Sequence, residues 1–191
     1  MSKSRIQIRV ENLLTEAAIT SPAIPVEKLA RNLGVQINFA PFEGDLSGLI
    51  YREQTPEGNH ATVIGVNSLH SPNRRRFTVA HEIGHLVLGH LDSLEQEIHI
   101  DRNFIGIRRD GRSALAVDNK EIAANQFAAE LLMPTEMLKN DFEVFRADSI
   151  DGFDYEDDEL ASALADRYKV SLQAMVIRLT RLGLIGQGVD E

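Results

Sequence analysis

The chain has 191 residues, of which 43% are hydrophobic, so it can bury one sizeable core. It contains no cysteine, which excludes disulfides and thiolate metal sites and leaves His, Asp and Glu as ligands for any bound metal. The formal net charge of −9 argues against broad affinity for nucleic acid, because phosphate binding requires clustered Lys and Arg.

No stretch reaches the roughly 20 apolar residues of a membrane span. The N-terminus mixes charges into an amphipathic pattern and lacks the apolar core of a signal peptide. We therefore expect a soluble cytoplasmic protein that does not associate with membranes.

The first third of the chain predicts two helices followed by three strands. Residues 4–19 place their apolar side chains near one helical face. Pro25 and Gly34 delimit a second, short helix. Three β-branched, apolar segments then predict strands, at 35–42, 46–53 and 60–68.

The rest of the chain is mostly helical. Ser71 and Pro72, a capping hydroxyl followed by proline, predict the start of a helix that stops at Gly89. Residues 91–117 are polar and irregular and predict no element. Further helices are expected at about 118–133, with a continuation after Pro134, and at about 157–167 and 171–182.

These elements predict an α+β fold in which a small, partly antiparallel sheet packs on two helices, with a C-terminal helical tail. We expect a main domain over residues 1–147, and an acidic linker with the helical tail over residues 148–191.

The sequence HEIGH at residues 81–85 is the strongest indication of chemistry. His81 and His85 lie about 40° apart on a helix, so both imidazoles can reach one ion. Glu82, about 100° from His81, can approach the water beside that ion and accept its proton. The alternative is a core helix with two hydrogen-bonded histidines, since Phe77, Ile83 and their neighbours leave little polar surface. Gly84 predicts close approach of another element.

A third ligand is needed, because catalytic zinc sites usually have three protein ligands and an open position. The acidic and histidine candidates downstream are Asp92, Glu95, Glu97, His99, Asp101, Asp118, Glu121 and Glu130. Helical geometry favours Glu121, which lies in the middle of the apolar face that includes Ala124 and Ala128, whereas Glu130 lies about 180° away. Asn125, one turn on, can hydrogen-bond a ligand or the neighbouring helix. A carboxylate placed near a helix start for its dipole is the simpler alternative for Glu121.

His90 lies about 180° from His81 around the helix. We interpret it as a helix-end residue and not as a ligand.

The segments NSLHSPNRRRFTVAHEIGHLVLGH and EIAANQFAAELLMP, preceded by LSGLIYR, resemble the ImmA/IrrE family of metallopeptidases over about residues 25–135. The resemblance implies a compact zincin-like (gluzincin) core, His81, His85 and Glu121 as metal ligands, and Glu82 as catalytic base. It also implies a regulatory protein that cuts or inactivates a helix-turn-helix repressor. A polar insertion between His85 and Glu121 departs from the family pattern.

We therefore expect a zinc-dependent endopeptidase that regulates transcription by cleaving an XRE-type repressor, with manganese as the alternative metal. Two other classes remain: a metal-stabilised, non-proteolytic regulator or toxin–antitoxin component that binds a partner repressor, and a DNA-binding regulator. We expect an extended substrate to pair with the strand at 60–68, and Tyr51, Asn67 or Asn125 to support the oxyanion.

The sequence pattern of the tail is similar to that of a helix-turn-helix, with Lys169 at the position where glycine is usual. We expect Lys169, Arg178 and Arg181 to be exposed, yet a packing or partner-docking role suits this acidic region better than reading DNA. The run Arg74–Arg76, near a helix start, is interpreted as solvated charge.

Overall fold

The computed structural model describes residues 3–44, 46–54, 58–91, 98–102, 113–147 and 157–186. Contacts within the chain define two compact units: residues 25–128 form one, and residues 1–24 with 129–191 form the other. The domain boundary predicted between residues 147 and 148 adjoins a segment outside the described residues, and it stays a prediction.

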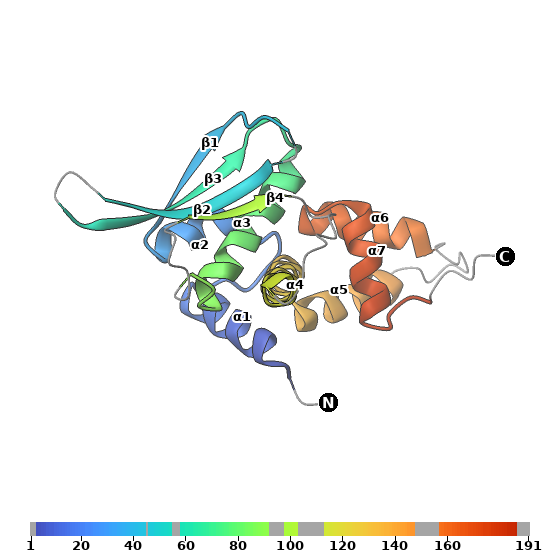
Figure 1. Cartoon of the computed structure of the whole chain (residues 1–191). Coiled ribbons are helices and arrows are strands. Elements are labelled where there is room, and N and C mark those ends of the chain that lie inside the picture. The colour runs from blue at the N-terminus through green and yellow to red at the C-terminus, as the bar shows by residue number, and fades with distance from the viewer. Residues whose placement is uncertain are drawn as a thin grey trace. The chain divides into compact units, whose positions relative to one another are not determined.

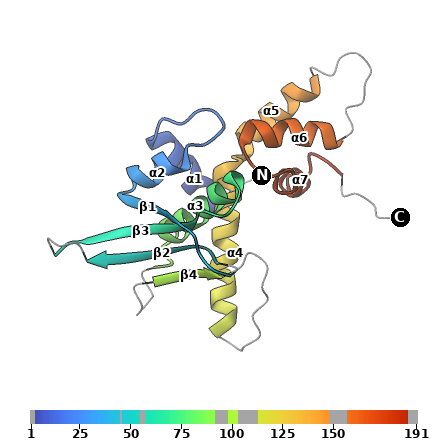
Figure 2. The same ribbon diagram turned by 90° about the horizontal axis from the view of Figure 1, so that it is seen from above.

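Unit 25–128 contains a four-stranded mixed sheet (Figure 1). Its strands are β1 (Val35–Ala40), β2 (Leu46–Gln54), β3 (His60–Asn67) and β4 (Ile98–Arg102). The order is β1-β3-β2-β4, which Figure 2 shows from edge to edge. β1 runs parallel to β3, whereas β2 is antiparallel to both β3 and β4. The three predicted strands are confirmed; β4 lies in the polar segment that predicted no element.

Two helices of this unit pack on the sheet, α2 (Val26–Asn32) on β1 and α3 (Pro72–Val87) on β2 and β3. α3 begins at Pro72 as predicted, but the Ser71 side chain makes no capping hydrogen bond. The shared core is apolar and fully buried, and includes Ile50, Val63, Ile64, Val66, Val79, Ala80 and Ile83. α4 (Ser113–Leu132) begins five residues before the predicted start at 118.

Two glycines allow α3 to lie close to its neighbours. A Cβ added at Gly84 would lie 3.2 Å from Ala124 O and 3.1 Å from the Phe127 side chain, both on α4. A Cβ added at Gly48, on β2, would lie only 2.3 Å from Thr78 Cγ2 of α3. The close approach predicted at Gly84 is thus confirmed, and the partner is the helix that carries Glu121.

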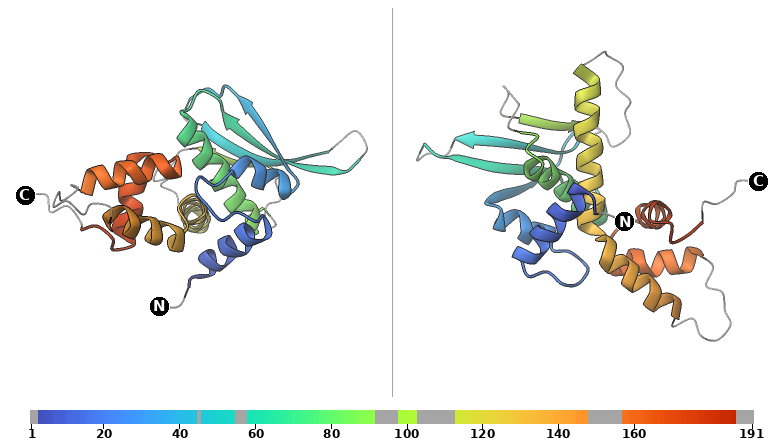
Figure 3. Two further views of the ribbon diagram at one scale, coloured as in Figure 1. Left: turned by 180° about the vertical axis from the view of Figure 1, so that it is seen from behind. Right: turned by 90° about the horizontal axis from the view of Figure 1, so that it is seen from below.

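The other unit contains α1 (Arg5–Glu16), α5 (Thr135–Ala147), α6 (Asp157–Tyr168) and α7 (Leu172–Arg181). Figure 3 shows α5, α6 and α7, coloured orange to red. α6 contacts α5 and α7, and the buried side chains Leu160, Ala161, Leu164, Met175 and Leu179 form their core. Lys169 has φ +55°, a left-handed conformation that explains why glycine is usual at this position.

Arg178 is not exposed, contrary to the prediction. Its side chain is 12% exposed and forms an ion pair with the buried Glu130. It also donates to Met133 O, and Glu130 accepts from the backbone and hydroxyl of Thr135. The tail helix α7 is therefore anchored by a buried charge pair.

The α+β class and the helical tail are confirmed. Among the described residues, no helix is long and apolar enough to cross a membrane.

Candidate metal centre

α3 supplies three functional side chains from its buried middle turns. His81, Glu82 and His85 are each at most 1% exposed. The polar groups lie among Val79, Ala80 and Ile83, where burial of an unsatisfied polar group is costly. Such a position therefore requires partners from neighbouring elements.

α4 brings Glu121 to the two histidines. Glu121 Oε2 lies 3.2 Å from His81 Nε2, and its Oε1 lies 3.5 Å from His85 Nε2. The two Nε2 atoms are 2.9 Å apart. One ligand atom from each residue lies within 4.8 Å of the others, so the group can hold a metal ion.

The two imidazole Nε2 atoms lie 2.9 Å apart, and each has a different oxygen of Glu121 at 3.2 or 3.5 Å, so all three side chains face one common point. Two imidazoles and a carboxylate are also the donor set that zinc accepts at sites with an open fourth position.

Asn125 fixes the orientation of His81. Its Oδ1 lies 3.0 Å from His81 Nδ1. Because an amide oxygen only accepts, this hydrogen bond places a proton on His81 Nδ1, and Nε2 faces His85 and Glu121. The hydrogen bond predicted between Asn125 and a candidate ligand or the neighbouring helix is confirmed, since Asn125 accepts from His81 of α3.

His90 performs the same task for His85, a role that the sequence analysis missed. Its Nδ1 lies 3.1 Å from His85 Nδ1, and the rings meet edge to face with centroids 5.0 Å apart. Lys120 of α4 donates to the His90 carbonyl oxygen at 3.2 Å, which ties this turn to α4. Gly89, directly before His90, is the signal in the sequence that could have indicated this. It takes φ +73° and bends the chain, so the helical phase of α3 no longer predicts where His90 lies.

Glu82 lies beside strand β2. A Cβ added at Gly48 would be 3.5 Å from Glu82 Oε1, so the missing side chain leaves room for this carboxylate. Gly48 belongs to the LSGLIYR segment, and the sequence analysis had assigned it no function.

The other candidate ligands do not join this group among the described residues. Glu130 forms an ion pair with Arg178 and accepts a hydrogen bond from Thr135. Asp92, Glu95 and Glu97 lie outside the described residues, as do the side chains of His99, Asp101 and Asp118.

Two expectations about the substrate cleft need correction. The strand at 60–68, β3, is paired on both sides, by β1 and β2, so it offers no free edge to a peptide. Asn67 is 2% exposed, and its amide bonds the backbone of Phe42, Leu46 and Leu69. It therefore orders the chain between β1 and β2 and is not available to an oxyanion.

The arginine run is only partly solvated. Arg74 donates to the buried Ser47 hydroxyl at 2.9 Å, and the Arg75 guanidinium lies 5.7 Å from the centroid of the Phe39 ring. Arg76 is half-buried, and its burial lowers the pKa of its guanidinium while Glu27 opposes the shift.

With this geometry in place, comparison with known proteins identifies the class. The sequence profile of the IrrE N-terminal-like domain, a peptidase family, matches residues 30–180. The chain therefore belongs to this family, and the predicted resemblance to ImmA/IrrE proteins is confirmed.

A solved structure titled "Mycobacterium tuberculosis transcriptional regulator" has a similar fold, with a TM-score of 0.60 and 17% sequence identity. The match covers 93% of this chain but 47% of the other, so the chain spans about half the length of that regulator. A search of curated proteins finds no match.

Proposed function

We propose that this chain is a zinc-dependent endopeptidase that regulates transcription by cleaving a helix-turn-helix repressor of the XRE type. The observation that supports this most is the convergence of His81, His85 and Glu121, with Glu82 on the same buried helix. Membership of a peptidase family and the fold shared with a transcriptional regulator are consistent with it.

In this proposal His81, His85 and Glu121 would hold zinc, or manganese in its place, and the ion would supply Lewis-acid chemistry for peptide hydrolysis. Asn125 and His90 keep the ring nitrogens of His81 and His85 turned toward it. Glu82 accepts the proton of the attacking water and later gives it to the leaving amine. Its burial keeps this carboxylate away from bulk water, so the accepted proton stays at the site.

The sheet limits where an extended substrate can pair. Within the described strands, only β1 and β4 have an edge without a partner strand. β4 lies next to β2, the strand whose Gly48 adjoins Glu82. A peptide added to β4 is therefore the arrangement we favour, because backbone hydrogen bonds at a free edge hold a chain extended.

Glu82→Gln tests the peptidase. The change is nearly isosteric, so metal content and fold should be kept, while cleavage should fall by about 10²–10⁴ because an amide cannot accept the proton. The assay is co-expression with the XRE-type repressor encoded nearest to this gene, followed by detection of a shortened product and of derepression. His81→Ala is the companion variant and should lose metal and cleavage together.

A non-proteolytic regulator is the second candidate, because the buried ligand group would also stabilise a scaffold. This candidate predicts the opposite result for the Glu82→Gln variant. If the Glu82→Gln protein relieves repression as well as the unaltered chain, binding alone accounts for regulation and the proposed peptidase is wrong.

A further inference from the structure

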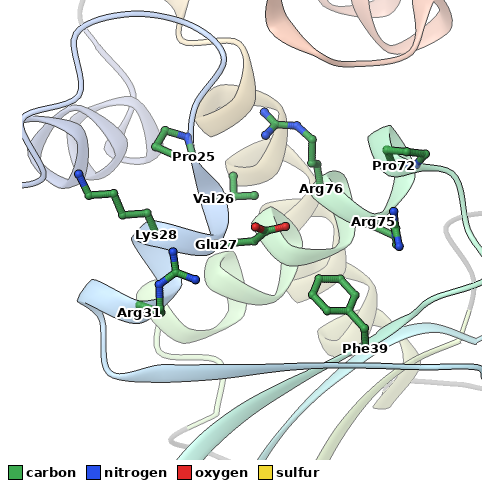
Figure 4. Close-up of a pocket in the computed structure, with 9 residues that line it drawn as sticks. All are labelled: Pro25, Val26, Glu27, Lys28, Arg31, Phe39, Pro72, Arg75 and Arg76. Carbon is green, nitrogen blue, oxygen red and sulfur yellow. The ribbon is translucent and has the colours of Figure 1, made fainter.

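A pocket of about 430 Å³ lies in unit 25–128, away from the metal ligands. It is lined by residues of α2, of β1 and of the start of α3. Figure 4 shows the side chains that line it, with the Glu27 carboxylate in the middle of the group. Its volume lies within the range of about 300–1,000 Å³ that is typical of small-molecule sites.

The pocket concentrates positive charge in an acidic protein. Arg31 lines it from α2, and Arg75 and Arg76 from α3, whereas the Lys28 side chain, also of the lining, points away from the group in Figure 4 and Glu27 is the single acidic residue of the lining. The chain as a whole has a net charge of −9. Because cations gathered in one cavity repel one another, their clustering favours a negatively charged occupant.

The start of α3 adds to this potential. Pro72 lines the pocket and is the first residue of the 16-residue helix. The unsatisfied N–H groups and the positive dipole end of a helix favour anions at this position. The helix end supplements the three arginines here and would not define a site without them.

An exposed aromatic ring lies on the same pocket. Phe39, on the edge strand β1, is 46% exposed although its neighbours Val35 and Val66 are buried. The Arg75 guanidinium lies 5.7 Å from the ring centroid. A flat aromatic face beside a guanidinium is suited to stacking a planar ring, as aromatic side chains stack on nucleobases.

The pocket is separate from the metal group. Arg76 and His81 are five residues apart on α3, so they point about 140° away from one another around the helix axis. No residue of the pocket belongs to the metal group. Occupancy of the pocket therefore adds a second ligand to the chain and does not block the metal.

We propose that this pocket binds a small molecule of the nucleotide class, whose phosphates meet Arg31, Arg75 and Arg76 and whose planar ring stacks on Phe39. A volume of about 430 Å³ matches that of a small ligand. The inference stands on the pocket alone and does not depend on the proposed peptidase activity.

The test is calorimetric titration of the full chain with ATP, ADP, pyrophosphate and adenosine at low salt. ATP and ADP should bind, pyrophosphate more weakly, and adenosine not measurably. Arg31→Ala and Arg75→Ala should each weaken ATP binding by about tenfold or more, since each removes a charge-assisted contact. Phe39→Ala should weaken ATP binding and leave pyrophosphate binding unchanged.

Three further variants make the result specific. Glu27→Gln should strengthen ATP binding severalfold, because it removes the only negative charge of the pocket lining. Arg146→Ala, an exposed arginine of the other unit, should have no effect. His81→Ala should still bind ATP, which separates the pocket from any phosphate binding at the metal centre.

Circular dichroism spectra that match the spectrum of the unaltered chain establish that each variant is folded. The proposal is wrong if no probe binds, if the Arg31 and Arg75 variants bind ATP like the unaltered chain, or if affinity disappears with His81. It is also wrong if polyglutamate binds through these arginines while ATP does not, since the pocket would then receive an acidic protein partner.

Discussion

At the scale of single residues, the candidate site consists of three side chains that could bind a metal ion and two side chains that contact them. His81 and His85 could be predicted from their spacing, because a helix repeats every 3.6 residues and brings both to one side. Glu121 could be predicted from its place on an apolar face, which the contact with both histidines now explains. Asn125 followed from the same helical phase. His90 could not be predicted, because it follows the left-handed Gly89, where the phase of α3 is lost.

His90 gives the first prediction at this scale. His90→Ala should weaken zinc binding by about 10–100-fold without abolishing it, since residues that orient a metal ligand typically have effects of this size. Zinc affinity is measured by competition with a chromogenic chelator.

His90→Asn is the matched control for this variant. Its side-chain oxygen can still accept a hydrogen bond, so it should recover part of the affinity. Glu121→Ala should lose far more zinc affinity than His90→Ala, and Glu130→Ala should lose no zinc affinity. A His90→Ala protein with unaltered zinc affinity would show that its contact with His85 is incidental.

At the scale of helices and strands, most elements follow from apolar periodicity and from glycine and proline. Strand β4 does not, because its sequence is polar and its place depends on pairing with β2, a contact distant in sequence. The contact between β2 and α3 depends on Gly48, whose missing side chain no periodicity predicts.

Gly48→Ala should destabilise the protein by about 1–3 kcal/mol, the usual cost of overpacking a core. The added methyl group would lie 2.3 Å from Thr78 Cγ2 and 3.0 Å from Gly65 O, so α3 or β2 must move. Urea denaturation measures the loss. Thr78→Ser removes the nearer of these atoms, and the double variant should therefore be more stable than Gly48→Ala alone. If Thr78→Ser gives no recovery, the crowding arises elsewhere.

The pair of Glu130 and Arg178 joins α4 to α7 within one unit. Arg178→Ala should cost about 3–5 kcal/mol, because it leaves a buried carboxylate without its cation. The double variant with Glu130→Gln should lose less than the Arg178 variant alone, since the amide that replaces the carboxylate is uncharged and its oxygen could still accept from Thr135. Exposed Arg181→Ala, in the same helix, should change stability by less than about 0.5 kcal/mol. Additive losses would mean that the two charges are not coupled.

At the scale of the whole molecule, the positions of the positively charged side chains make DNA recognition the weakest of the functional alternatives. The helical tail is similar to a helix-turn-helix in its apolar pattern, but Arg178, which was expected to be exposed, is only 12% exposed and forms an ion pair with Glu130. The remaining cations of α7 and its preceding turn are few in a chain of net charge −9. Among the described residues, Arg31, Arg75 and Arg76 gather around a pocket of unit 25–128, and none of them belongs to the helix-turn-helix-like tail.

The two units also make different predictions for metal removal. All three candidate ligands belong to unit 25–128, on α3 and α4, so a bound ion stabilises this unit directly. At a free zinc concentration about 100 times the dissociation constant, that stabilisation is about 2.7 kcal/mol. A chelator should therefore speed amide hydrogen exchange in α3 by up to about a hundredfold, because local opening free energies set the exchange rates. The amides of α7, whose core and ion pair lie in the other unit, should exchange at unchanged rates.

His81→Ala should speed exchange in α3 without chelator and show no response to zinc. Equal acceleration in α3 and α7 would show that the chain unfolds as one cooperative body. Unchanged exchange rates in both helices would show that no bound ion stabilises the fold.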